Sequence, residues 1–403
     1  MRFILTALAL QALLATTASL AQQSTDLSHD SPAWNDVLAG AEGQTVHWYA
    51  WAGDDRINAY IAWAAAELNS RYGIRVEQVP VTDTAEVVNL VRTEVLAGRD
   101  ETGSVDLVWI NGENFAAMKR DGLLHAPWTQ ALPNLPLVDV EGKPSTQTDF
   151  SEPVNHQESP WGMAQFNFIY DAAVVADFPA DISALAAWAQ ANPSRFTYPQ
   201  PPNFLGTTFL KQALYELTDA PDLLRLSAEE ADTAAVTAPL WDYLDALHPH
   251  LWQQGQRFPA NGPAAQALFQ EGALDMLLSF FPTEGAGLVL EGSFPSSTAV
   301  AGFAGGTIGN THFLAIPVNA EDAEGAMVLA NFLLSPEAQA RKQDPAVWGD
   351  GTVLNLQKLD AEAQARFEAL PAQARIDIGP TLLEPHASWV EVLEAGWMQR
   401  YGR

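Results

Sequence analysis

The chain has 403 residues, a formal net charge of −29 and no cysteine. The missing cysteine excludes disulfides, thiolate metal sites, cysteine nucleophiles and the lipidated cysteine of a bacterial lipoprotein. The strong negative charge repels phosphate backbones and anionic lipids, which argues against binding to nucleic acid or to a membrane surface. The length is sufficient for two domains, each with its own core.

The N-terminus has the pattern of a secretory signal peptide. Met1, Arg2 and Phe3 precede an apolar stretch over residues 4–20, and small residues stand at its end. Threonines and a glutamine interrupt this stretch, which makes it short and polar for a membrane span. We therefore expect cleavage of residues 1–21 before Gln22, and a soluble, non-lipidated protein in the periplasm.

The first part of the mature chain alternates between predicted strands and helices. An apolar and aromatic run over 46–51 predicts a buried strand, and a helical pattern follows it up to Gly73. A second strand over 74–81, a helix that ends near Gly98 and a third strand over 105–110 continue the alternation. A nearly all-apolar strand is typical of a parallel sheet covered on both faces, so the fold class is α/β.

A polar connection over 136–160 separates this part from an aromatic, extended segment over 161–170, after which we expect a second domain. The elements expected after that point are a helix near 184–188, a helix over 209–217, a buried strand over 274–281, an extended run over 312–318, a helix over 324–334, a helix opened by Ser335 and Pro336, and a helical tail from 356 onward.

Two segments that directly follow predicted strands combine aromatic and polar side chains. They are residues 51–55 (WAGDD) and residues 109–115 (WINGENF). Ligands of open parallel sheets bind at the carboxyl ends of the strands, and aromatic faces with nearby carboxylates attract cations. The two segments therefore suit an organic ligand with a cationic or polar end. The alternative is that the two tryptophans are core residues and that Asp54 and Glu113 only cap helices.

Other motifs give weaker signals. No GxSxG, HExxH, P-loop or complete GxGxxG motif is found in the sequence, which weakens an enzymatic interpretation. The glycine-rich residues 305–309 could bring backbone amides to an anion, but an ordinary loop is the simpler interpretation. His248 and His250 flank a proline without neighbouring carboxylates, so we expect surface histidines there. We expect no enzymatic activity, no cofactor and no metal.

Several further segments carry a family resemblance along nearly the whole mature chain. They are residues 48–53 (WYAWAG), 103–115 (GSVDLVWINGENF), 160–162 with 164–165, 195–199 (RFTYP), 202–204 (PNF) and 330–339 (ANFLLSPEAQ). With them the chain resembles the YnjB-like branch of ABC-transporter substrate-binding proteins. The resemblance implies two lobes of the type-2 periplasmic-binding-protein fold, an interlobe cleft for a small-molecule solute, and an inner-membrane ABC permease with its ATPase as partners.

On this basis the mature chain divides into three parts. Residues 22–168 form the first part of lobe 1, residues 169–307 form lobe 2, and residues 308–403 return to lobe 1 with C-terminal helices. The chain is expected to cross between the lobes twice, near 166–171 and near 305–311. A monomer is expected.

The site residues are inferred from the strand ends of lobe 1 and the facing loops of lobe 2. Trp51 and Trp109 would stack on the ligand, Glu113 would neutralise a cationic end, and Asn111 and Asn203 would fix hydrogen-bonding groups. The predicted ligand-binding set is Trp51, Asp54, Trp109, Asn111, Glu113, Asn114, Gln165, Asn203, Phe204, Thr207, Ser279, Phe281 and Asn310.

Capture of a small organic solute for import, with a cationic solute as one option, is the main hypothesis. A secreted hydrolase is the alternative, and it would need two carboxylates that converge in the cleft. The candidates for such a pair are Asp54, Glu113, Asp275 and Glu284. A periplasmic sensor with the same fold is a third possibility, which the sequence does not separate from an importer component.

Overall fold

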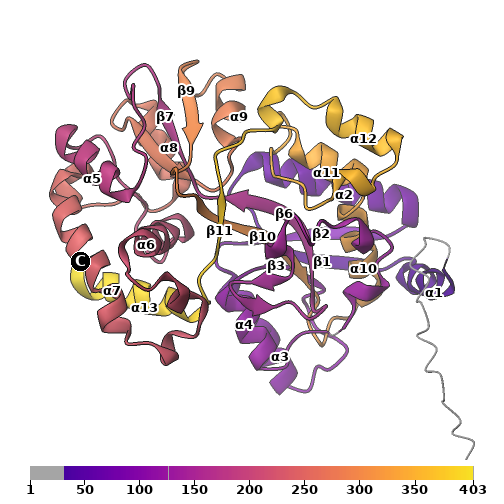
Figure 1. Ribbon diagram of the computed structural model, residues 1–403. Coiled ribbons are helices and arrows are strands. Elements are labelled where there is room, and N and C mark those ends of the chain that lie inside the picture. The colour runs from indigo at the N-terminus through magenta and orange to yellow at the C-terminus, as the bar shows by residue number, and fades with distance from the viewer. Residues whose placement is uncertain (1–30, 126, 403) are drawn as a thin grey trace, which may run out of the picture.

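Two lobes lie side by side, each with its own sheet and its own hydrophobic core (Figure 1). The computed structural model describes residues 31–125 and 127–402, so the predicted signal peptide and its cleavage point lie outside the described residues. Over the described residues, no helix combines the length and the apolar character needed to cross a membrane.

Lobe 1 is built on a mixed sheet with the strand order β11-β10-β3-β1-β2, and β6 pairs with β10. Strand β1 is parallel to β2 and β3, whereas β10 is antiparallel to β3 and β6. The strands are β1 (Thr45–Trp51), β2 (Arg75–Val81), β3 (Leu107–Ile110), β6 (Glu158–Gln165), β10 (Thr307–Ala315) and β11 (Thr381–Leu383), with a separate ribbon of β4 (Thr148–Asp149) and β5 (Glu152–Pro153). The helices are α1 (Pro32–Ala41), α2 (Asp55–Tyr72), α3 (Thr84–Leu96), α4 (Glu113–Arg120), α10 (Ala323–Leu333), α11 (Pro336–Gln343) and α12 (Ala361–Glu368).

Lobe 2 contains a three-stranded antiparallel sheet with the order β8-β7-β9, surrounded by helices. The strands are β7 (Asn167–Asp171), β8 (Met276–Ser279) and β9 (Thr298–Ala301). The helices are α5 (Ile182–Ala191), α6 (Phe204–Leu217), α7 (Thr233–Leu247), α8 (Gly262–Gln270), α9 (Glu284–Leu290) and α13 (Ser388–Tyr401).

Capping residues fix where the helices that face the other lobe begin. The Asp54 carboxylate accepts hydrogen bonds from the backbone N–H groups of Arg56 (2.7 Å) and Ile57 (3.3 Å), so α2 starts directly after β1. At its other end α2 stops at Gly73, whose φ of 70° is accessible to glycine at little cost. The sequence predicted both ends of this helix.

The chain crosses between the lobes three times, once more than expected. Strand β6 continues through Phe166 into β7, and β10 lies beside this crossing with Gly309 opposite Gln165. The Phe166 N–H donates to the Ile308 carbonyl at 2.7 Å. The third crossing is β11, which is parallel to β10 over 307–309. Figure 1 shows β11 between the lobes.

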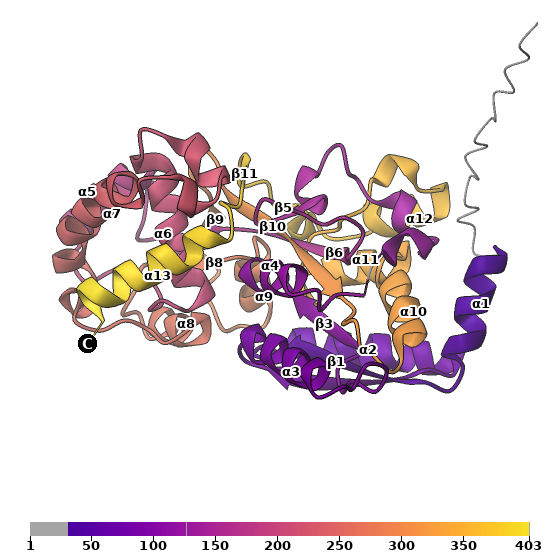
Figure 2. The ribbon, with the colours of Figure 1, turned by 90° about the horizontal axis from the view of Figure 1, so that it is seen from below.

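The end of the predicted return to lobe 1 is wrong, because α13 packs in the core of lobe 2. Trp389, Leu393 and Trp397 lie in the same buried cluster as residues of α6 and α7, and Figure 2 shows α13 lying across lobe 2. These three residues recur every four positions and form an apolar stripe on one face of the helix. A stripe of this kind must be covered, but its sequence does not say by which lobe.

His248 also differs from the prediction of a surface histidine. The side chain is buried in lobe 2, and its Nε2 lies 2.7 Å from the Tyr198 hydroxyl. Burial lowers the pKa of His248 to about 4, so the ring is neutral at physiological pH. The histidine therefore belongs to the core of lobe 2.

The packing of α13 can be tested with two neighbouring residues of opposite exposure. Trp397 is 1% exposed and its Nε1 donates to the Tyr198 hydroxyl at 2.8 Å, whereas Met398 is 44% exposed. We expect Trp397→Ala to lower the free energy of unfolding by roughly 3–5 kcal/mol because it leaves a cavity. Met398→Ala should change it by less than about 0.5 kcal/mol. Scanning calorimetry of both variants checks this, and equal effects would contradict the assignment of α13 to lobe 2.

Candidate ligand-binding site

Lys211 is the charged centre of the first interlobe cluster. It lies on α6, its Nζ is 2.6 Å from Glu384 Oε2 at the end of β11, and both side chains are buried. The same Nζ lies 4.3 Å from the ring centroid of Phe150, which belongs to lobe 1. One ion pair and one cation–π contact therefore join lobe 2, the third crossing strand and lobe 1 at a single point.

Two carboxyl groups from opposite lobes face this cluster. Glu113 opens α4 in lobe 1 and is exposed to solvent, although surrounding protein atoms desolvate its carboxyl and raise its pKa. Glu394 of α13 in lobe 2 accepts a 2.6 Å hydrogen bond from Thr207 Oγ1. A carboxyl that is both accessible and desolvated lies in a concave part of the surface. Phe204, whose ring is 38% exposed, begins α6 nearby, with its centroid 5.5 Å from Lys211 Nζ.

A small hollow lies between β10, β11 and the 145–151 segment of lobe 1. Asn310 in this hollow is 4% exposed, and its Nδ2 donates to Glu384 Oε1 at 3.3 Å. The Asn310 Oδ1 atom has no hydrogen-bond partner within the described parts of the chain. The hollow is lined by Ser145, Thr148, Phe150, Ser151, Gly309, Asn310, Leu383 and Glu384. A hydrogen-bond donor placed there would find an unused acceptor.

Aromatic rings form the second interlobe contact. The ring of Trp109 lies 4.9 Å from Trp161 and 5.1 Å from His312, all in lobe 1. Phe281 of lobe 2 approaches the same group, with centroid distances of 5.8 Å to His312 and 6.2 Å to Trp348. Trp109 is partly buried against the core of lobe 1 and contacts His312 and Trp348, the two rings that Phe281 of lobe 2 approaches.

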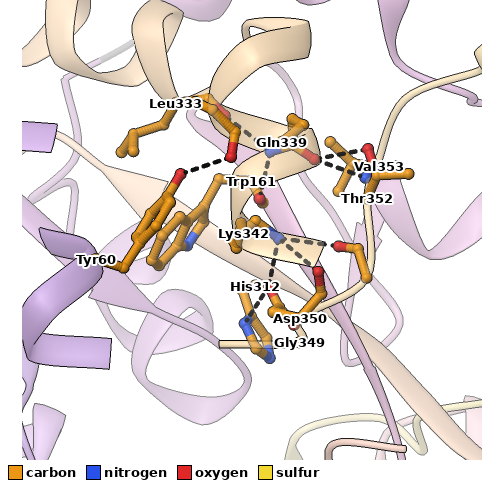
Figure 3. A network of polar contacts seen from close by, with 12 residues as sticks. Tyr60, Trp161, His312, Leu333, Gln339, Lys342, Gly349, Asp350, Thr352 and Val353 are labelled. Carbon is orange, nitrogen blue, oxygen red and sulfur yellow. Dashed lines mark hydrogen bonds and ion pairs between the residues drawn. The ribbon is translucent and has the colours of Figure 1, made fainter. Parts of the chain in front are cut away.

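A buried polar network fixes these rings from behind (Figure 3). The Nζ of Lys342 lies 2.5 Å from Asp350 Oδ2 and donates to the Gly351 carbonyl at 2.9 Å. His312 Nδ1 is 3.6 Å from the same carboxylate, and burial lowers the pKa of this histidine. Gln339 Nε2 donates to the Trp161 carbonyl at 2.7 Å. Because the Lys342–Asp350 pair is buried and hydrogen-bonded, β6 with Trp161 and β10 with His312 have little freedom to move.

Arg56 forms the third interlobe contact. Its Nη2 lies 3.1 Å from Asp54 Oδ2 in lobe 1 and 4.0 Å from Glu284 Oε1 in lobe 2. Ser279 donates through its hydroxyl to the other oxygen of Glu284. The structure thus brings together two predicted residues, Asp54 and Ser279. The described residues contain no group of three or more His, Cys, Asp or Glu side chains that could hold a metal ion.

Comparisons with known proteins assign this architecture. A model of the family described as bacterial extracellular solute-binding protein matches residues 63–362. The chain belongs to this family. Protein YnjB of Escherichia coli (strain K12) is 45% identical over 369 residues, which cover 92% of this chain and 94% of that protein. The predicted resemblance to the YnjB-like branch is therefore confirmed.

Solved structures of periplasmic binding proteins share the fold of this solute-binding protein. AfuA from Actinobacillus pleuropneumoniae, with fructose-6-phosphate bound, has a TM-score of 0.61 at 12% identity and covers 89% of this chain and 98% of its own. A periplasmic thiamin binding protein has a TM-score of 0.61 at 16% identity, over 89% and 95% of the two chains. A putative spermidine/putrescine ABC transporter from Listeria monocytogenes has a TM-score of 0.59 at 16% identity, over 89% and 99%. The predicted type-2 periplasmic-binding-protein fold is confirmed.

Seven of the thirteen predicted site residues gather around the first and second contacts of this solute-binding protein. Around Lys211 and Glu384 lie Glu113, Asn114, Phe204, Thr207 and Asn310, and around His312 lie Trp109 and Phe281.

Four other predicted residues are not brought into these groups. Gln165 uses its side-chain amide to bind Thr307 Oγ1 (3.1 Å) and the Pro380 carbonyl (3.0 Å), so it ties the crossing strands together. Asn203 caps α6 by accepting from the Leu205 N–H at 3.1 Å. Trp51 is exposed and lies against Gly53. Asn111 is partly exposed in the turn between β3 and α4.

The carboxylates proposed for a hydrolase do not form a catalytic pair of the expected kind. Asp54 and Glu284 both face the Arg56 guanidinium, at 3.1 Å and 4.0 Å from its Nη2. Asp275 precedes β8 and forms an ion pair with Arg195, whereas Ser279 stands at the other end of that strand. The family identified for the chain consists of binding proteins.

Lys211, Glu384 and Glu394, the charged residues of the first interlobe cluster, are absent from the set predicted from the sequence. Lys211 follows Phe204 by seven positions and Thr207 by four, so the three share one face of α6. Lys211 is the single cationic residue of α6, which is a usable signal in the sequence. Glu394 was missed because α13 was assigned to the other lobe. Arg56 stands two residues after Asp54 and was not considered as a contact between the lobes.

The acidity of Glu394 makes stability depend on pH. Burial, followed by the charges of Glu113 and Asp83, raises the pKa of Glu394 from 4.5 to about 7, against the opposing effects of Thr207 and Lys211. A carboxyl with a raised folded-state pKa favours the protonated folded protein, so its ionisation destabilises the fold as pH rises from about 4.5 through 7. We expect Glu394→Gln to match the wild-type melting temperature at pH 5 and to exceed it at pH 8.

Thermal melts across this pH range measure the effect. The glutamine keeps an acceptor for Thr207, so the variant isolates the charge. A difference between the two proteins that does not depend on pH would contradict the assignment.

Proposed function

We propose that the protein captures a small organic solute with a cationic end between its two lobes and delivers it to an inner-membrane ABC permease with its ATPase. Membership of the extracellular solute-binding family supports the capture of a solute. A cationic ligand is favoured because Glu113 of lobe 1 and Glu394 of lobe 2 both face the cluster around Lys211. No described cation other than the already paired Lys211 acts on both of these carboxyls.

The similarity in fold does not indicate whether the ligand is a cation or an anion. AfuA has a sugar phosphate bound, whereas other structural neighbours are named for thiamin or for polyamines. The acidic side chains of this protein favour a cation. Two acidic groups in a desolvated space repel each other unless a cation lies between them, and a cation there gains the attraction of both.

The remaining groups of the cluster fit the same ligand. The exposed ring of Phe204 offers a face for the cationic group or for an adjacent apolar part of the solute. The unpartnered Asn310 Oδ1 faces a hollow with room for about one water molecule, so it would accept a hydrogen bond from a water that bridges to the solute. Closure of hinged lobes around the solute would remove these groups from water together and strengthen each interaction.

The predicted signal peptide supports export, so we propose that this activity takes place in the periplasm. We propose that the mature, monomeric protein begins at Gln22 after cleavage of residues 1–21. Intact-mass measurement of the protein recovered from the periplasm should give the mass of a chain starting at or near Gln22. Recovery of the full-length chain in the membrane fraction would contradict both the cleavage and the localisation.

A solute panel tests the charge of the ligand. Spermidine, putrescine and thiamine form the cationic arm, and fructose 6-phosphate forms the anionic arm. A solute that binds only the folded protein raises its melting temperature, so we expect shifts confined to the cationic arm. For a cation that shifts the melt, calorimetry on Glu113→Gln should show roughly 10- to 100-fold weaker binding, because a hydrogen bond to a charged group contributes about 1.5–3 kcal/mol.

Glu271→Gln is the matched control. Glu271 is exposed at the C-terminal end of α8, and its substitution makes the same change in net charge. Its affinity for the solute should equal that of the wild type. A shift caused by the anionic solute alone, or equal affinities in the two variants, would contradict the cationic assignment.

A further inference from the structure

Helix α9 of lobe 2 lies directly against the start of α2 in lobe 1. Arg56 of α2 faces two glutamates of this region, with Nη2 4.0 Å from Glu284 Oε1 and Nε 3.8 Å from Glu291 Oε1. At the start of α9, the Thr283 hydroxyl donates to the carbonyl of Gly349 in lobe 1. The lobes therefore contact each other directly here, at a place separate from the cluster around Lys211.

Glycines in both lobes make this close approach possible. A Cβ atom on Gly287 would lie 2.4 Å from Arg56 Nη1, and a Cβ atom on Gly349 would overlap Thr283 Oγ1. Glycine inside a helix destabilises that helix relative to alanine, so its position in α9 needs a reason. The guanidinium that lies over Gly287 provides one. The two surfaces are shaped for each other in the closed arrangement.

Arg56 is placed for contact between the lobes. Its Nη1 is buried without a hydrogen-bond partner among residues 31–125 and 127–402, and its Nη2 and Nε are directed at carboxylates. The distances from Arg56 to Glu284 and Glu291 are too long for hydrogen bonds, so the attraction of Arg56 to these two glutamates is purely electrostatic. A buried N–H without a partner regains water when the lobes separate. The contact therefore favours closure but can be released.

We propose that Arg56 is a positioning residue that sets the balance between open and closed lobes from outside the ligand-binding cluster. The inference rests on the proposed capture of a solute between the lobes. The Arg56 contact attracts α9 to lobe 1, whereas Glu113 and Glu394 repel each other across the same interface. A protein whose closed state is populated before binding has a higher apparent affinity, since less of the binding free energy is used for closure.

Distance measurements on the protein without any solute test this role. The chain has no native cysteine, so Leu96→Cys and Val174→Cys place one spin label on each lobe, both at exposed positions. Pulsed electron paramagnetic resonance (double electron–electron resonance) then reports the distribution of distances between the labels. We expect Arg56→Ala to increase the population at long distances several-fold, and Arg56→Lys, which keeps the charge, to increase it less.

Arg71→Ala is the matched control on the same helix. Arg71 pairs with Glu67 and Glu337, both in lobe 1, so its loss should leave the distances unchanged. Glu291→Gln changes the partner side of the contact at a half-exposed position and should lengthen the distances slightly even if Arg56→Ala folds poorly. Unchanged distributions in Arg56→Ala and Glu291→Gln would overturn the proposal. Because no solute is present, the result is independent of the outcome of the cationic panel.

Discussion

The buried ion pair between Lys211 and Glu384 is the interaction on which the arrangement of the two lobes depends. It attaches the end of the third crossing strand to α6, and Phe150 covers the same ammonium group from lobe 1. Burying such a pair gives little net stability, but removing one partner leaves an uncompensated charge in the interior. The main effect of the Lys211–Glu384 pair is therefore to exclude arrangements that separate the two residues. The pair holds the end of β11 beside α6, at the point where the chain enters lobe 2 before α13.

The interface between the lobes combines contacts of opposite sign. The aromatic group around His312 and the guanidinium of Arg56 hold the lobes together, whereas the carboxyl groups near Lys211 oppose their approach. The buried network of Lys342 and Asp350 makes the lobe 1 side of the aromatic contact rigid. A binding protein needs such a balance, because lobes that close too strongly would not release the solute and lobes that do not close would not retain it.

Much of the fold could be predicted, because local patterns determine it. The strand expected over 46–51 is β1 (Thr45–Trp51), and Asp54 and Gly73 delimit α2 as their chemistry requires. The destination of α13 could not be predicted, since an apolar stripe specifies burial but not a partner. Glu113 follows the end of β3, the position from which it was predicted, whereas Asn310 lies within β10. Lys211 and Glu394 were missed because they become neighbours only through the third crossing.

The third crossing also determines when the molecule can fold. The sheet of lobe 1 includes β10 and β11, and the core of lobe 2 includes Trp389 and Trp397 from the last helix. Neither lobe is a continuous stretch of sequence, and the core of lobe 2 is incomplete until α13 supplies Trp389 and Trp397. Domains whose sequence is continuous can fold during synthesis, N-terminal domain first. In this chain lobe 2 cannot complete its core before α13 is available, although its sheet strands all precede β10 in the sequence.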